Sequence, residues 1–282
     1  MINRCIVSAL IFSCLAGYPG GAASTGLSFV EEFSDTKAMD EGLTTAKVCT
    51  SEQTLMQGFQ KTPWQSTNRP WERGILDEQG YDTRSIAVGD LNGDRYPDIA
   101  VANYGEVNLI YFGKGDGTFG PGAPLSSDTH NTEGIELGDI NGDAHPDLIE
   151  GNSNAYNYFY INNGDGTFQV PTAFSGDTCD TRAVALGDVN NDGWMDVVFA
   201  NNGKAPLCYY NDTGVFKKAV DIGEEALPAT GILIDDVNRD GWPDLVLGSW
   251  DHPLRVFLNN GKGLFEQSLA VTRDTQKMEA LV

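Results

Sequence analysis

Four acidic loops are the part of this sequence whose residue types and spacing could do chemistry. Each follows the pattern Asp-x-Asn-x-Asp-x-x-x-Asp, which places side-chain oxygens at positions 1, 3, 5 and 9 of a short loop. The loops begin at Asp90, Asp139, Asp188 and Asp236, which are 49, 49 and 48 residues apart. Calcium takes about six to eight oxygen ligands and tolerates irregular geometry, whereas magnesium demands a stricter octahedron. The pattern therefore predicts about four Ca²⁺ sites.

The expected calcium ligands are the oxygen-bearing side chains of each loop and the backbone carbonyl at position 7. They are Asp90, Asn92, Asp94, Tyr96 and Asp98; Asp139, Asn141, Asp143, His145 and Asp147; Asp188, Asn190, Asp192, Trp194 and Asp196; and Asp236, Asn238, Asp240, Trp242 and Asp244. An Asx-turn that needs no metal is the alternative. A helical EF-hand is not expected, because it requires Glu at position 12 and only Glu150 meets that requirement.

The side chain at position 7 is aromatic in every loop. The residues are Tyr96, His145, Trp194 and Trp242. One interpretation is a set of platforms on which sugars stack. The other, which we favour, is that these rings pack against the neighbouring repeat and shield the ion.

The loops are positioned by a repeat of about 49 residues. A second motif, Gly115-Asp-Gly-Thr-Phe119 in the first copy, recurs in phase, and its last residues are Phe119, Phe168, Phe216 and Phe265. Short runs of β-formers bounded by turn residues, such as 85–89, 99–102, 107–112 and a strand opening at Phe119, predict four strands per repeat. Four strands in a repeat of this length are typical of a β-propeller blade, and a solenoid of stacked sheets is the competing architecture.

The predicted fold class is therefore all-β, a β-propeller of four-stranded blades. Residues 1–23 form a signal peptide, residues 24–81 a β-rich segment or linker, and residues 82–282 the propeller repeats. The blades cover about 82–130, 131–179, 180–227 and 228–276, and residues 277–282 begin a fifth. Two interpretations of the ends stay open. Either the chain is a fragment of a longer ring, or the strand 278–282 joins residues 28–60 in a composite fifth blade.

Composition limits the possible partners. The chain has 282 residues, 18 Lys and Arg against 40 Asp and Glu, and a formal charge of −22. Such a field repels a phosphate backbone, so a nucleic acid is not an expected partner. With 40% hydrophobic residues the acidity does not indicate disorder, and 33 Gly favour many turns.

The N-terminus indicates export. A basic start at Arg4, an apolar run over 5–15 and small residues before Ser24 are typical of a signal peptide rather than of a membrane anchor. We expect a secreted or cell-surface protein with no transmembrane segment in the mature chain, and a periplasmic or lipid-anchored protein is less favoured. Of the remaining cysteines, Cys179 and Cys208 either pair, leaving Cys49 alone, or all three stay reduced.

The repeat resembles the FG-GAP family, also called VCBS repeats. The residues that carry the resemblance are Phe112-Gly113 and, after the turn, Gly122-Ala123-Pro124. The resemblance, over about 82–282, implies a calcium-binding propeller, usually seven-bladed, that binds proteins or glycans. By similarity to integrin-type propellers, partners bind the face away from the calcium loops. Here that face would carry Tyr104, Asn152, Asn154, Tyr156, Asn201, Asn202, Trp250 and His252.

The predicted function is that of an extracellular recognition or adhesion module for a protein or a glycan. No nucleophile elbow, His-Glu-x-x-His motif or Cys-His arrangement is visible, and the three histidines lie apart. An enzyme is therefore not the first expectation. The alternatives are a carbohydrate-active lyase or hydrolase on the same scaffold, and a structural repeat segment of a larger surface protein.

Overall fold

The computed structural model describes residue 76 and residues 79–174, 178–217, 219–224 and 226–271. The chain divides into two units at Arg73–Gly74, and the described residues all belong to the second. They form strands and turns without a helix, which confirms the all-β prediction, and so they contain no helix able to cross a membrane. The predicted signal peptide 1–23, residues 24–75 with Cys49, and the expected fifth-blade strand 277–282 lie outside the described residues.

The first two blades share one long strand. Their strands are β1 (Thr83–Gly89), β2 (Asp98–Tyr111), β3 (Ala123–Gly138), β4 (Asp147–Ala155), β5 (Tyr158–Tyr160) and β6 (Thr172–Ala173). The beginning of β3 pairs with the end of β2, and its other end pairs with β4. The predicted boundary between residues 130 and 131 therefore falls inside a strand. The outer strand opens at Ala123 and not at Phe119, which makes only an isolated bridge to Gly113.

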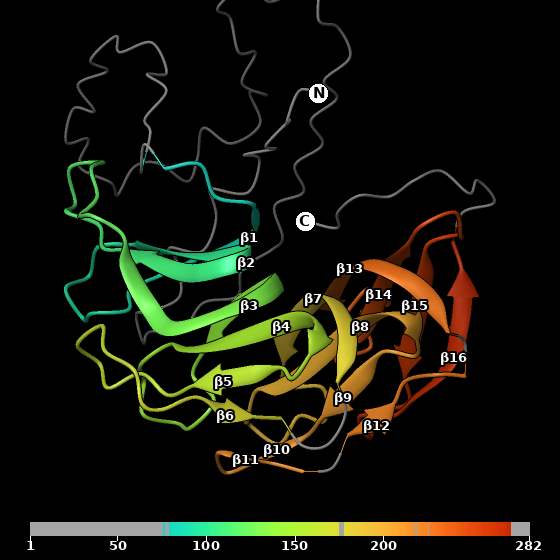
Figure 1. The fold of residues 1–282 in the computed structure, drawn as a ribbon. Helices are drawn as coiled ribbons and strands as arrows, with labels where there is room; N and C mark the ends of the chain where they lie inside the picture. The colour runs from blue at the N-terminus through green and yellow to red at the C-terminus, as the bar shows by residue number, and fades with distance from the viewer. Residues whose placement is uncertain (1–75, 77–78, 175–177, 218, 225, 272–282) are drawn as a thin grey trace, which may run out of the picture. The chain divides into compact units, whose positions relative to one another are not determined.

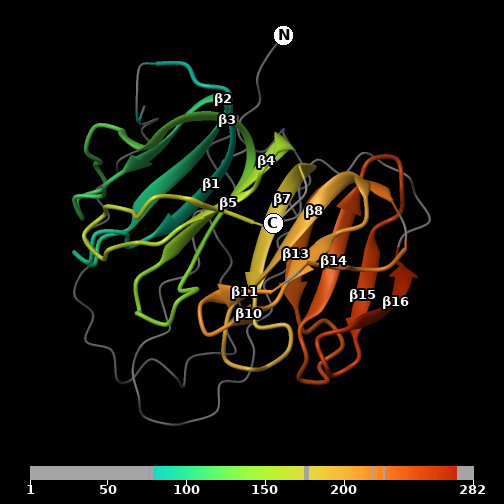
Figure 2. The same cartoon turned by 60° about the horizontal axis from the view of Figure 1, so that its bottom comes forward.

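The third and fourth blades repeat this order. Their strands are β7 (Cys179–Gly187), β8 (Asp196–Lys204), β9 (Leu207–Tyr209), β10 (Asn211–Asp212), β11 (Val215–Phe216), β12 (Val220–Asp221), β13 (Leu227–Asp235), β14 (Asp244–Ser249), β15 (Arg255–Asn259) and β16 (Phe265–Ala270). β12 pairs with β9, whereas β10 and β11 form a separate hairpin. Figures 1 and 2 show the strands of each repeat side by side, with successive repeats following one another.

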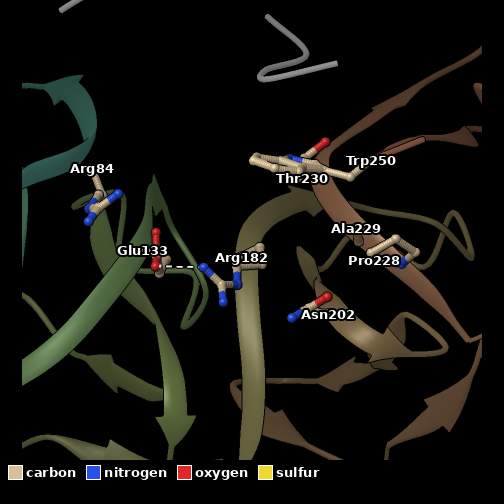
Figure 3. Close-up of a pocket in the computed structure, with 8 residues that line it drawn as sticks. All are labelled: Arg84, Glu133, Arg182, Asn202, Pro228, Ala229, Thr230 and Trp250. Atoms are coloured by element: carbon tan, nitrogen blue, oxygen red, sulfur yellow. Dashed lines mark hydrogen bonds and ion pairs between the residues drawn. The ribbon is translucent and has the colours of Figure 1, made fainter. Parts of the chain in front are cut away.

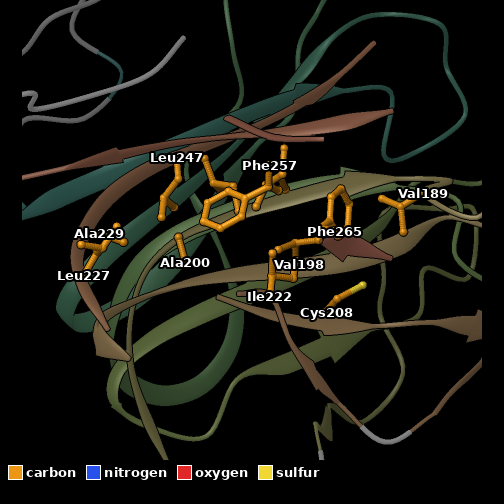
Figure 4. Close-up of a cluster of buried hydrophobic side chains, with 13 residues drawn as sticks. Val189, Val198, Ala200, Cys208, Ile222, Leu227, Ala229, Leu247, Phe257 and Phe265 are labelled. Atoms are coloured by element: carbon orange, nitrogen blue, oxygen red, sulfur yellow. The ribbon is translucent and has the colours of Figure 1, made fainter. Parts of the chain in front are cut away.

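Apolar side chains from neighbouring blades form the core. Alternate residues of a strand point to opposite faces, so the inner strands of each blade offer an apolar surface to both neighbours. Between the third and fourth blades, Val198 and Ala200 of β8 belong to one buried cluster with Leu247 of β14 and Phe257 of β15 (Figure 4). Similar clusters combine blades one and two, and blades two and three.

A repeated asparagine fastens each blade to the one before it. The Nδ2 group of Asn162, Asn211 and Asn259 donates to the carbonyl oxygen of Leu91, Ile140 and Val189, respectively, at 2.9, 2.7 and 2.7 Å. The acceptor is always position 2 of the preceding acidic loop. We call this contact the asparagine latch. In the first blade the corresponding residue is Gly113.

The two outermost blades each have an exposed apolar position that is buried elsewhere. Ile86 of the first blade is 40% exposed, whereas its equivalents Ile135, Val184 and Ile232 are buried. At position 2 of the fourth loop, Val237 is 46% exposed, whereas Leu91, Ile140 and Val189 are fully buried. The described strands thus form an open row of four blades.

Cys179 and Cys208 are not joined by a disulfide. Cys208 is a free thiol in the core between the third and fourth blades, and burial raises its pKa. Cys179 is buried at the start of β7, where the Lys204 ammonium lies 3.8 Å from its sulfur. Of the two alternatives for this pair, the structure shows the reduced one.

Candidate functional site

The four acidic loops share one backbone conformation. In each loop, positions 4 and 6 both have positive φ, the left-handed region that favours glycine. Each loop supplies glycine at only one of them: Gly93 and Gly142 at position 4 in the first two loops, and Gly193 and Gly241 at position 6 in the last two. The other position is filled by Arg95, Ala144, Asn191 or Arg239, with φ between 54° and 71°. Each loop therefore keeps its conformation although one non-glycine residue has an unfavourable backbone conformation.

In each loop, side-chain carboxylates accept hydrogen bonds from backbone N–H groups of the same loop. In the second loop, Asp139 accepts from the backbone N–H of Gly142 at 2.7 Å and of Ala144 at 2.8 Å. The Asn141 side-chain oxygen accepts from the N–H of Asp143 at 2.9 Å, and Asp143 accepts from that of His145. The other loops show the same type of bonding. These bonds bring the oxygens at positions 1, 3 and 5 into one short loop.

The aspartate at position 9 is buried and joins two parts of its blade. Asp147 accepts from the backbone N–H of Ile140 at 3.0 Å and of Asn162 at 2.8 Å, and Asp98 and Asp196 make the equivalent bonds. Burial raises the pKa of Asp147 and Asp196 to about 6, and the other acidic residues of each loop add to this rise. In the fourth loop, one buried oxygen of Asp244 has no hydrogen-bond partner among the described residues.

This donor set fits calcium better than other common ions. It consists of carboxylate, amide and carbonyl oxygens, which are the ligands that a hard cation prefers. The Asp244 oxygen that lacks a partner among the described residues is particular to the fourth loop, because in the other three loops the equivalent oxygen accepts from the N–H of position 2. As the side chains lie, no three His, Cys, Asp or Glu of the described residues already form a metal-binding group. Binding would therefore require the half-buried carboxylate at position 1 and the exposed carboxylate at position 5 to turn toward the buried one at position 9.

The aromatic rings at position 7 lie over glycines of neighbouring turns. Tyr96 covers Gly115 and His145 covers Gly164, both in their own repeats, and a Cβ atom at either glycine would collide with the ring. The Trp194 ring lies against Gly142 in the preceding repeat's loop. These contacts give the rings a packing role at the loop end of the blades.

A cavity of about 450 Å³ lies at the opposite ends of the strands. We call it the mouth (Figure 3). Its lining residues are Arg84, Glu133, Arg182, Asn202, Pro228, Ala229, Thr230 and Trp250. Arg84, Glu133, Arg182 and Thr230 are the bulged residues of the four inner strands, at the register shifts between 83 and 85, 132 and 134, 181 and 183, and 229 and 231.

Ion pairs organise one side of the mouth. Arg182 binds Glu133 and Asp180, each at 2.9 Å, and the dashed line in Figure 3 marks the first of these bonds. Arg84 binds Asp82 at 2.8 Å and lies over the Tyr104 ring, with its guanidinium carbon 5.0 Å from the centroid. Burial raises the pKa of Glu133, and the two arginines oppose that rise. Trp250, 44% exposed, lies on the other side.

Of the residues predicted for this face, some lie at the mouth, some are exposed elsewhere and two are buried. Asn202 and Trp250 line the mouth, and Tyr104 supports Arg84. Asn154, Tyr156 and His252 are exposed but do not line it.

Asn152 and Asn201 require a correction, because both side chains are fully buried. Asn152 donates to the Tyr156 carbonyl at 2.8 Å, and Asn201 accepts from the Thr181 hydroxyl at 2.9 Å. They hold the blades in shape and are not exposed to a ligand.

None of the motifs in the sequence points to the four bulged residues. A signal for them exists, because each follows Thr83, Thr132, Thr181 or Ala229 and precedes a small residue. Aligned in this way, the repeats show Arg, Glu, Arg and Thr at one position between nearly constant neighbours.

Comparison with known proteins gives a family and a fold. The model of the FG-GAP-like repeat matches residues 90–150, 139–199 and 236–278, more than half of the chain. No curated protein matches.

Among solved structures, the chain is similar to an Agrocybe aegerita lectin that recognises non-reducing terminal N-acetylglucosamine, with 22% identity and a TM-score of 0.52 over 67% of this chain and 52% of that one. The computationally designed Ika8 protein gives 12% identity and a TM-score of 0.46, over 69% of this chain and 51% of that one. The chain thus spans about half the length of these structures. The first likeness agrees with a β-propeller.

Proposed function

This chain belongs to the FG-GAP-like repeat family, and on that premise we propose that it is an exported, calcium-stabilised recognition module that binds glycans at the mouth. The observation that carries the proposal is the combination of a concave site, an exposed Trp250 and hydrogen-bonding groups from Asn202, Thr230 and the ion-paired side chains. The leader pattern in residues 1–23 supports export.

A saccharide matches the chemistry of the mouth. The apolar face of a sugar ring stacks on an aromatic side chain, while its hydroxyl groups both donate and accept hydrogen bonds. Trp250 offers the ring, the arginines offer donors, and Glu133 and the Asn202 amide offer acceptors. The Agrocybe lectin is a precedent for a sugar site on a related fold.

The acidic loops support calcium binding at the other end of the blades. Each loop holds three carboxylates and an asparagine oxygen within nine residues, and their mutual repulsion is relieved by a cation. Calcium would therefore stabilise the folded state in proportion to its occupancy of the loops.

We expect calcium to raise the melting temperature and a chelator to lower it. A site held at about 100 times its Kd contributes about 2.7 kcal/mol, and about 1 kcal/mol shifts a domain of this size by about 2–4 °C. Several sites together should give a difference above about 10 °C, measured by calorimetry with and without chelator. An unchanged melting curve would contradict the calcium assignment.

A matched pair of variants identifies the ligands. Asp188→Asn should weaken calcium binding at the third loop, measured by titration calorimetry, because it removes a charge from position 1. Asn191→Gly is the control, because glycine adopts the positive φ of position 4 without strain. Asn191→Ala would be a poorer control, since alanine is strained at this positive φ, although both substitutions remove the 3.2 Å hydrogen bond from the Asn191 amide to the Gly241 carbonyl of the next loop. Equal losses for both variants would show that the register of ligands is wrong.

Glycan binding is tested on a printed glycan array and then in solution. Trp250→Ala should weaken binding at least about tenfold, as loss of a central aromatic contact does. Trp194→Ala, at the loop end of the blades, is the control and should bind normally. The bound glycan should keep its mass, since a recognition module leaves its ligand unaltered, whereas a lyase or hydrolase would shorten it. Binding that is insensitive to Trp250→Ala would contradict the mouth as the site.

A further inference from the structure

The residue type at the bulged position changes from repeat to repeat, whereas the residues around it stay nearly the same. A β-bulge places one extra residue out of register and re-aims its side chain. The residues next to the bulges repeat: Thr83, Thr132 and Thr181 precede them, and Asn103, Asn152 and Asn201 oppose these threonines. The bulged position itself is Arg84, Glu133, Arg182 and Thr230. The same backbone arrangement thus presents a guanidinium group from the first and third blades, a carboxylate from the second and a hydroxyl from the fourth.

Hydrogen bonds between blades keep the bulged strands in place. Asn108 of the first blade donates to the Thr132 hydroxyl of the second at 2.9 Å, and Asn157 of the second donates to the Thr181 hydroxyl of the third at 2.9 Å. These bonds lie one residue away from Glu133 and Arg182. The side chains at the mouth are therefore placed on rigid elements, as a selective binding site requires.

The charges of the mouth disfavour an acidic ligand. Its two arginines face three carboxylates, those of Asp82, Glu133 and Asp180, in a chain of net charge −22. A carboxylate or sulfate on the ligand would add to this local excess of negative charge. Sugar hydroxyls, in contrast, can donate to Glu133 and accept from Arg84, whose guanidinium makes one hydrogen bond among the described residues.

We infer that Arg84, Glu133, Arg182 and Thr230 are the specificity-determining residues of the mouth, and that they select an uncharged sugar over an acidic one. The inference rests on the proposed glycan binding and adds the class of sugar. Glu133 is the residue that rejects the acid, since it is the only acidic member of the four.

The test compares neutral glycans with the same glycans ending in a uronic acid. Affinities of the wild type, Glu133→Gln, Arg84→Gln and Trp250→Ala are measured for both sets, using the full chain in calcium. Wild type should prefer the neutral set. Glu133→Gln removes one like charge within a few ångströms of the ligand. The ratio of the affinity for neutral glycans to the affinity for uronic-acid glycans should therefore shift toward the uronic acids about tenfold. Arg84→Gln, at an exposed arginine, should weaken both sets and shift the ratio the other way.

The outcomes separate the inference from the proposed function. Binding that Trp250→Ala abolishes, with a ratio unchanged in Glu133→Gln and Arg84→Gln, would overturn the inference and leave glycan recognition intact. A wild type that prefers uronic acids would also overturn it. A wild type that binds no glycan would contradict both the proposed glycan recognition and the inferred preference for uncharged sugars. Melting temperatures of the variants check folding, and if Glu133→Gln is unfolded, the Arg84→Gln ratio alone decides.

Discussion

Glu136 is an acidic side chain at a position where two other blades have alanine. It lies on β3 and corresponds to Ala87 and Ala185, which are buried between neighbouring blades. Partial burial there raises the pKa of Glu136 to about 7, against only one opposing backbone hydrogen bond. The carboxyl thus favours its neutral form in the folded state.

The raised pKa makes stability depend on pH. The folded protein holds the Glu136 proton more tightly than the unfolded chain does. The contribution of this proton to the free energy of unfolding is therefore complete below about pH 4.5 and is lost as the pH rises to about 7. Glu136→Gln should therefore raise the free energy of unfolding at pH 8 by about 1–3 kcal/mol and change it little at pH 4.5, measured by urea denaturation. The exposed Glu224→Gln is the control. No gain at pH 8 would show that the carboxyl is not destabilising.

At the scale of the element, the asparagine latch ties the end of a blade's third strand, or the residues just after it, to the loop of the preceding blade. Asn162 is buried, donates to the carbonyls of Leu91 and Pro146 at 2.9 Å each, and accepts from the N–H of Gly164. One side chain thus satisfies backbone groups of two blades and a turn. A residue that could not hydrogen-bond would leave these groups without partners in a buried place.

Asn162→Ala should lower the free energy of unfolding by about 2–4 kcal/mol, because it leaves buried backbone groups unpaired. The adjacent Asn163→Ala removes an exposed side chain that bonds Thr167 within its own turn and no other described residue, and should cost under about 1 kcal/mol. Chemical denaturation of the two variants measures the difference. A similar cost for both would mean that the latch does not stabilise the blade interface.

The sequence predicted the repeat, the strand order and the loops, because these follow from local alternation and turn residues that recur four times. It did not predict the bulges, because a bulge depends on which residues face each other across two strands. Asn152 and Asn201 were misassigned for a similar reason. Asparagine is common in exposed turns, and only the fold shows that these two amides are buried against Tyr156 and Thr181.

At the scale of the whole described unit, the row of four blades has two unmatched faces. The face of the first blade that bears Ile86 and the face of the fourth that bears Val237 lack the neighbour that covers the equivalent residues elsewhere among the described residues. Interior interfaces bury position 2 of the loop completely, as at Val189. Replacing position 2 by aspartate should therefore lower the free energy of unfolding more in an interior blade than in the fourth blade.

Val189→Asp should lower the free energy of unfolding by more than about 3 kcal/mol, because it buries an unpaired carboxylate between the third and fourth blades. Val237→Asp should cost under about 1 kcal/mol, because that side chain is exposed. Urea denaturation of both variants gives the comparison. A large cost at Val237 would show that the face of the fourth blade is covered in solution.

The asparagine latch also bears on how such a chain could have grown. Donor and acceptor lie 71, 71 and 70 residues apart in the three latches, so each latch spans one repeat boundary in the same way. A tandem duplication of one repeat-length stretch of the gene would carry a new donor asparagine and a new acceptor carbonyl together. Each added unit would thus bring the donor for the junction with the unit before it and the acceptor for the junction with the unit after it, and blade number could change by whole units without compensating mutations.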